Sequence, residues 1–107
     1  AISPRIIELI TRVSNEFGGR TIKVVSGYRL GKTSKTSRHR HGKAMDFIVV
    51  NVPNKAVRDF VKTFNRVGVG YYPNSHFVHL DVRKQWTYWI DYAGPGQAPR
   101  YAGFWTR

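Results

Sequence analysis

The chain has 107 residues, the length of one domain, and 41% of them are hydrophobic, so a disordered chain is excluded and a single unit over residues 1–107 is expected. It contains no cysteine and no run of about 18 apolar residues, which excludes disulfides, cysteine-ligated zinc, cysteine nucleophiles and a membrane-spanning helix. Eighteen Lys and Arg residues against six Asp and Glu residues give a net charge of +12, and such a surface attracts nucleic acid, anionic cell-wall polymers or acidic membrane surfaces.

Two segments have the spacing of amphipathic helices. Residues 3–17 begin with Ser3 and Pro4, which suit the cap and the first position of a helix, and a double glycine ends the run. The residues expected on the core face of this helix are Ile6, Ile7, Ile10, Val13 and Phe17. A second helix is predicted over residues 54–66. Its expected core face consists of Val57, Phe60, Val61 and Phe64.

The remaining periodic segments have strand patterns. The segments predicted to be strands are residues 21–26, 44–50, 67–72, 76–82 and 85–92. The second is almost entirely apolar, so we expect it in the centre of the sheet, and the third and fourth are expected to form a hairpin. Residues 27–43 lack an apolar period and are expected to form a basic loop, while the tail after residue 92 is expected to wrap over the surface. This order predicts an α+β domain with a small, mainly antiparallel sheet flanked by two helices.

One acidic residue stands out because it lies inside an apolar strand pattern. Asp46 is flanked by Met45 and Phe47, and a buried, ionised carboxylate is costly unless it is paired or binds a metal. His39 precedes it by seven residues, and His79 comes from the predicted hairpin. Two imidazoles and a carboxylate, with a fourth position left for water, form the ligand set of a catalytic zinc ion. From residue types alone, an Asp–Arg pair, a packed strand histidine and a solvated basic loop remain open alternatives.

Four segments carry motifs that occur together in one enzyme family. The longest, SRHRHGKAMD at residues 37–46, fits the pattern S-x-H-x-x-G-x-A-x-D. The others are SGYR at residues 26–29, GVGYY at 68–72 and FVHLD at 77–81. Together they resemble the peptidase M15 family of D-Ala-D-Ala carboxypeptidases and murein endopeptidases, in its MepK-like branch, over residues 22–86. The resemblance implies the fold that this family shares with hedgehog signalling domains and lysostaphin-type enzymes.

The resemblance also implies a zinc site and a general base. The residues that it implies as Zn²⁺ ligands are His39, Asp46 and His79. Asp81 lies two residues after His79 in a strand pattern, so both should face the same way, and Asp81 is a candidate for the base or for orienting His79. Many family members carry an acidic residue three positions before the last zinc ligand, where this chain has His76. The base therefore stays open among Asp81, His76 and His41.

The same resemblance suggests which residues contact substrate. Arg29 is expected to bind a substrate oxygen and to stabilise the oxyanion of a tetrahedral intermediate. Ser37 is expected to hydrogen-bond substrate, or else to cap the loop. From residue type and not from the resemblance, Tyr71 and Tyr72, together with other aromatic residues of the strands, are expected to line a substrate groove, because aromatic faces suit sugar rings and peptide stems. Ordinary packing of aromatic residues in a hairpin is the alternative.

The resemblance implies a zinc-dependent metallopeptidase that hydrolyses peptide bonds of bacterial peptidoglycan, as a murein endopeptidase or a D,D- or L,D-carboxypeptidase. We expect a monomer in the periplasm or cell envelope, exported by a signal upstream of Ala1 and attracted to anionic cell-wall polymers. A non-catalytic, zinc-containing wall-binding domain of the same fold is the first alternative. A nucleic-acid-binding domain is a weaker one, because the basic residues are not interleaved with aromatic residues on one helix or strand.

Overall fold

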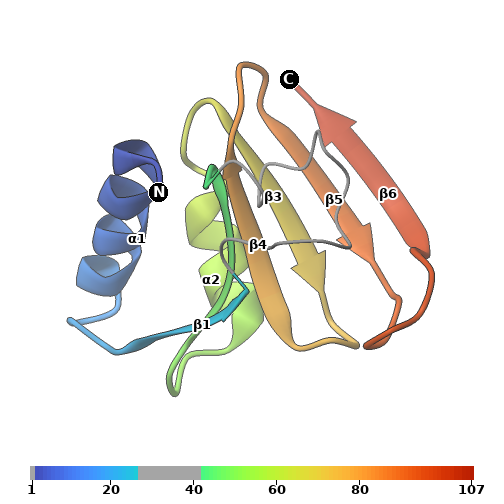
Figure 1. Ribbon diagram of the computed structural model, residues 1–107, viewed down its shortest axis with the longest axis horizontal. Coiled ribbons are helices and arrows are strands. Elements are labelled where there is room, and N and C mark those ends of the chain that lie inside the picture. The colour runs from blue at the N-terminus through green and yellow to red at the C-terminus, as the bar shows by residue number, and fades with distance from the viewer. Residues whose placement is uncertain (1, 27–41) are drawn as a thin grey trace.

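The computed structural model describes residues 2–26 and 42–107 of the chain (Figure 1). The helices and strands of these residues are, in order, α1 (Pro4–Glu16), β1 (Ile22–Ser26), β2 (Ala44–Val49), α2 (Asn54–Val61), β3 (Val67–Tyr72), β4 (Phe77–Val82), β5 (Thr87–Asp91) and β6 (Tyr101–Thr106). This is the α+β architecture that the sequence predicts. Within the described part of the chain, no helix is long and apolar enough to cross a membrane. The predicted basic loop falls almost wholly outside the described residues.

The strands form one sheet in the order β1-β2-β4-β3-β5-β6. Neighbouring strands run antiparallel except for β3 and β5, which run parallel. The hairpin between β3 and β4 is confirmed. The apolar strand β2 lies inside the sheet but not at its centre, since β1 covers one of its edges and β4 and β3 are the middle strands.

The prediction that the tail only wraps the surface was wrong. Residues Tyr101–Thr106 form β6, which pairs with β5 and lies at the edge of the sheet (Figure 1). An edge strand that is exposed on both faces lacks the alternation of buried and exposed residues by which a strand is recognised. Part of its contact with the sheet comes from Trp105, whose ring stacks on that of Tyr88 with a centroid distance of 5.1 Å.

The hydrophobic core lies between the two helices and one face of the sheet. In α1 the predicted core residues Ile6 and Val13 are buried, and Ile10 and Phe17 pack against the core. Ile7 is exposed, so its prediction was wrong, and Leu9 is buried in its place. The helix α2 ends at Val61, earlier than predicted, but the turn that follows still buries Phe64. The largest fully buried side chains elsewhere in the core are Phe47, Val49, Val57, Val61, Val67, Val69, Val78 and Leu80.

Candidate active site

A row of polar and aromatic residues crosses the face of the sheet that is turned away from the helices. Asp46 on β2 pairs with His79 on β4, His79 pairs with Gly70 on β3, and Gly70 pairs with Trp89 on β5. Residues at paired positions point to the same face, so their side chains meet. The residues of the next row are Ala44, Asp81, Gly68 and Thr87. The expectation that His79 and Asp81 face the same way is confirmed.

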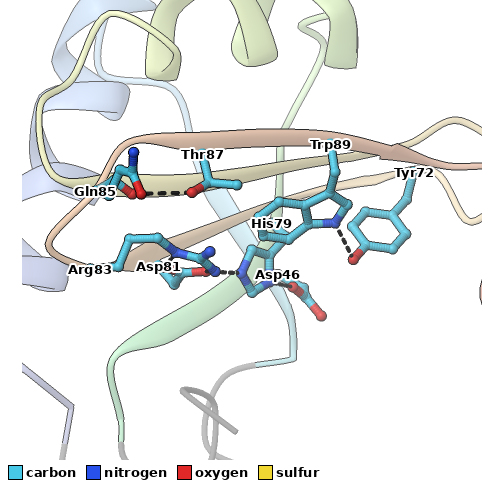
Figure 2. Close-up of polar contacts among 8 residues, drawn as sticks. All are labelled: Asp46, Tyr72, His79, Asp81, Arg83, Gln85, Thr87 and Trp89. Atoms are coloured by element: carbon cyan, nitrogen blue, oxygen red, sulfur yellow. Dashed lines mark hydrogen bonds and ion pairs between the residues drawn. The ribbon is translucent and has the colours of Figure 1, made fainter. Parts of the chain in front are cut away.

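His79 lies between two carboxylates (Figure 2). Its Nδ1 atom is 2.9 Å from Asp46 Oδ1, and its Nε2 atom is 2.7 Å from Asp81 Oδ2. Arg83 donates from Nε to Asp81 Oδ1 at 2.7 Å and from Nη2 to Asp81 Oδ2 at 2.6 Å. We call Asp46, His79, Asp81 and Arg83 the buried chain. Its two carboxylates alternate with an imidazole and a guanidinium, which is the order that lets neighbouring charges attract.

Burial and hydrogen bonding act in opposite directions on the pKa values of the buried chain. Burial alone would lower the pKa of His79, but the hydrogen bonds to Asp46 and Asp81 outweigh it and raise the pKa to about 9. Burial alone would raise the pKa of Asp81, but the hydrogen bonds from His79 and Arg83 hold it well below its usual value. Asp81 is therefore a fixed negative charge at neutral pH. The local field favours positive charge on or beside the imidazole.

The donors at Asp46 and His79 fit a metal ion. A carboxylate oxygen and an imidazole nitrogen face one another, and both atom types are zinc ligands. The other imidazole nitrogen contacts a carboxylate, which is the usual arrangement around a metal-ligating histidine because it fixes the tautomer and the ring orientation. In residues 2–26 and 42–107, no group of three or more His, Cys, Asp or Glu side chains could hold a metal. The third ligand implied by the resemblance, His39, lies outside the described residues.

Two glycines on β3 make room for the side chains of the site. A Cβ atom at Gly68 would overlap the Arg83 guanidinium and lie 2.5 Å from Asp81 Oδ2. A Cβ atom at Gly70 would lie 2.6 Å from the Tyr72 ring and 2.8 Å from the Trp89 indole. Both distances are shorter than real side chains allow, so β3 carries glycine where Arg83 and Trp89 cross it. The predicted motif at residues 68–72 thus has a steric reason.

Trp89 packs against both the histidine and Arg83, whose guanidinium carbon lies 5.1 Å from the centroid of the Trp89 ring, and Tyr72 lies on the side of Trp89 away from Arg83 (Figure 2). The Trp89 indole N–H donates to the Tyr72 hydroxyl at 2.9 Å. The centroids of the Trp89 and His79 rings are 5.2 Å apart. Tyr72 also lines a cavity of about 460 Å³ together with Asp46 and His79. Tyr71 instead packs against the core on the opposite face of the sheet. The central carbon of the Arg58 guanidinium lies 4.7 Å from the centroid of the Tyr71 ring. Of the two predicted substrate tyrosines, the structure brings only Tyr72 to the site.

His76 lies in the turn that precedes β4. Its φ angle is +61°, its side chain is exposed, and it is not among the residues that line the cavity beside His79. The irregular backbone at this position removes the strict alternation that would turn His76 away from His79. The predicted site residues that lie outside the described residues are Arg29, Ser37, His39 and His41.

Sequence reasoning missed two contributions to the site. Arg83 lies just beyond β4, two residues after Asp81, and only the space over Gly68 lets it reach that carboxylate. The spacing of Asp81 and Arg83 was a signal, since residues two apart in an extended segment share a face. Asp91 also lines the cavity, but its carboxylate accepts from the backbone N–H groups of Ala93 and Arg100, both at 2.9 Å, which anchors the segment leading to β6.

Comparisons with known proteins agree with the motifs. A sequence-family model of the peptidase M15 family, described as peptidoglycan L,D-endopeptidase MepK, matches residues 1–88. The probable peptidoglycan L,D-endopeptidase MepK of Haemophilus influenzae is 32% identical over 94 residues, which cover 76% of this chain and 50% of the relative. The peptidoglycan L,D-endopeptidase MepK of Escherichia coli K12 is 32% identical, with 77% of this chain and 52% of the relative covered. The chain thus spans about half the length of these relatives, and no solved structure matches it. The family match over most of the chain shows that it belongs to the peptidase M15 family, in the branch of MepK.

Proposed function

We propose that this chain carries the catalytic centre of a zinc-dependent metallopeptidase that hydrolyses peptide bonds of bacterial peptidoglycan. The observation that carries the proposal is a pair of possible metal ligands that face each other on adjacent strands, the Asp46 carboxylate and the His79 Nδ1 atom. Asp81 contacts the other ring nitrogen of His79, as expected around a metal-ligating histidine. Membership of the M15 family and the names of the relatives support the substrate class. Such an activity belongs in the cell envelope or periplasm, where we place the protein, with its positive charge attracting anionic wall polymers.

Each described residue of the buried chain has a role in this proposal. Asp46 and His79, with His39, are the ligands of Zn²⁺. The zinc ion would supply Lewis acidity, which polarises a peptide carbonyl and lowers the pKa of water. Asp81 accepts the Nε2 proton of His79 and holds the ring with Nδ1 turned to Asp46, so that a bound zinc ion would replace the proton on Nδ1. Arg83 holds both oxygens of Asp81, which fixes that carboxylate in turn.

Asp81 is a positioning residue in this proposal, not the general base. Its two oxygens are engaged by His79 and Arg83, and its low pKa makes it a weak proton acceptor. His76 and His41 remain the candidates for the base, because imidazole exchanges protons near neutral pH. Arg29 is the candidate for oxyanion stabilisation, and Ser37 and Tyr72 are the candidates for substrate binding. Tyr72 is supported by its place in the cavity beside His79.

The test is digestion of purified peptidoglycan and of soluble muropeptides, followed by mass analysis of the products. It uses the protein with added zinc, the chelated protein, and the Asp46→Ala variant as a control. Zinc-dependent conversion of cross-linked dimers to monomers would establish an endopeptidase, and loss of one D-alanine a carboxypeptidase. Protein that binds one zinc ion and the wall but yields no product would instead be a binding domain of this fold. Failure to bind zinc would overturn the proposed mechanism.

A further inference from the structure

A second cavity, of about 620 Å³, is lined almost entirely by cationic side chains. Its lining residues are Arg5, Lys43, Arg66, Val82, Arg83 and Lys84. These residues come from one end of the sheet, where α1, β2 and β3 begin and β4 ends. Among the described residues, 2–26 and 42–107, no acidic and no aromatic side chain belongs to the lining. We call this cavity the cationic pocket.

The cations of the pocket are only partly neutralised. Arg5 pairs with Glu8 at 2.7 Å, and Arg83 pairs with Asp81. The other three, Lys43, Arg66 and Lys84, form no ion pair in the part of the chain that the structure describes, which contains all six acidic residues of the sequence. Like charges gathered around one cavity repel one another, and a bound anion would relieve that repulsion.

Backbone hydrogen bonds hold the segments of the pocket together. The Val82 N–H donates to the Lys43 carbonyl at 2.9 Å, and the Arg83 N–H donates to the Arg66 carbonyl at 3.1 Å. Arg66 has a φ angle of +57°, a conformation that disfavours a side chain and persists only where the surroundings impose it. The chain therefore keeps an arginine at a position where glycine would fit better, and that arginine faces the pocket.

We propose that the cationic pocket binds a phosphate group of an anionic, non-nucleic-acid polymer, represented here by poly(glycerol phosphate). A phosphodiester offers two charged oxygens and two ester oxygens to surrounding Arg and Lys side chains, and the polymer repeats this group at short intervals, whereas a single carboxylate offers two oxygens and satisfies fewer of the five cations. The volume exceeds that of one phosphate and leaves room for its ester substituent. The described part of the lining offers no aromatic side chain on which bases could stack, which disfavours single-stranded nucleic acid as the occupant.

The proposal goes beyond the proposed function, because it depends on the cationic pocket and on no catalytic step. The test measures binding of poly(glycerol phosphate), inorganic phosphate and a single-stranded DNA oligonucleotide by calorimetry at fixed ionic strength. The pocket variant is Arg66→Gly with Lys84→Gln, which keeps the backbone at residue 66 and leaves the Arg83–Asp81 pair in place. The charge-matched control is Lys23→Gln with Lys55→Gln, two exposed lysines outside the pocket.

The pocket variant is expected to bind poly(glycerol phosphate) about tenfold more weakly, while the control binds like the unmodified protein. Inorganic phosphate is expected to bind more weakly than the polymer and to compete with it. Equal losses in both variants would overturn the proposal, because the attraction would then come from net charge alone. Tighter, pocket-dependent binding of the oligonucleotide would overturn the choice of polymer, and no pocket-dependent phosphate binding would overturn the site. Digestion of peptidoglycan by the same preparations separates this outcome from failure of the proposed function.

Discussion

At the scale of single residues, the function of Asp81 decides how the site works. A carboxylate that is almost completely buried and holds both His79 and Arg83 is placed to orient a ligand and not to exchange protons with solvent. This distinction matters because the sequence offers Asp81 equally well for both roles. The two roles affect different measured quantities.

Replacing Asp81 with Asn removes the charge while keeping the shape of the side chain. We expect zinc affinity to fall by about 10–100-fold, because the partner that fixes the His79 ring is weakened. A competition titration against a zinc-binding dye measures this, with thermal unfolding to confirm that the variant is folded. Unchanged zinc affinity together with a large loss of kcat would contradict the positioning role and make Asp81 the base.

Gly68 is a second position where a single atom matters. Alanine there would push the Arg83 guanidinium away from Asp81, so we expect Gly68→Ala to lower the free energy of unfolding by about 1–3 kcal/mol. Zinc affinity should fall with it. Urea unfolding checks the first effect. The matched control is Gly94→Ala, whose added Cβ would meet only the end of the Gln97 side chain at 3.2 Å and should change little.

At the scale of helices and strands, sequence periodicity predicts the elements that have one buried face. In β2 the side chains alternate, so Phe47 enters the core under the helices while Asp46 contacts His79 on the other face of the sheet. The edge strand β6 was missed because neither of its faces is fully buried. The contact between Arg83 and Asp81 was missed for another reason: it depends on Gly68 of the neighbouring strand β3, whose lack of a side chain leaves room for the Arg83 guanidinium.

The turn between α2 and β3 gives a prediction about stability. Arg66 has a positive φ angle, which costs a non-glycine residue about 1–2 kcal/mol, while glycine adds an entropic cost of about 0.5–1 kcal/mol. Arg66→Gly should therefore raise the free energy of unfolding by roughly 0.5–1 kcal/mol, as measured by urea titration. Asn51→Gly is the control, because Asn51 also has a positive φ angle but asparagine tolerates it, so little change is expected. A destabilised Arg66→Gly variant would show that the arginine side chain makes a structural contribution.

At the scale of the whole molecule, the fold separates stability from chemistry. The helices and the core occupy one face of the sheet, while Asp46, His79 and the cavity beside them occupy the other. The site therefore rests on strands that are fixed from behind by packed side chains. That arrangement holds the side chains of Asp46 and His79 in place. The net charge of +12 belongs to this scale too, because it acts over the whole surface and not at one residue.

The net charge predicts that salt affects the digestion of insoluble cell walls more than the cleavage of soluble muropeptides. Attraction to an anionic wall is screened by salt, with a screening length of about 10 Å at 0.1 M and about 3 Å at 1 M. Raising the salt concentration over this range should slow digestion of intact, polymer-bearing walls. It should leave cleavage of small soluble muropeptides nearly unchanged, because these require no long-range attraction. Parallel time courses on both substrates measure the effect, with walls stripped of their anionic polymers as the control. If salt slowed cleavage of both substrates equally, salt would act on the proposed catalytic site, and the surface charge would have no part in holding the protein on the wall.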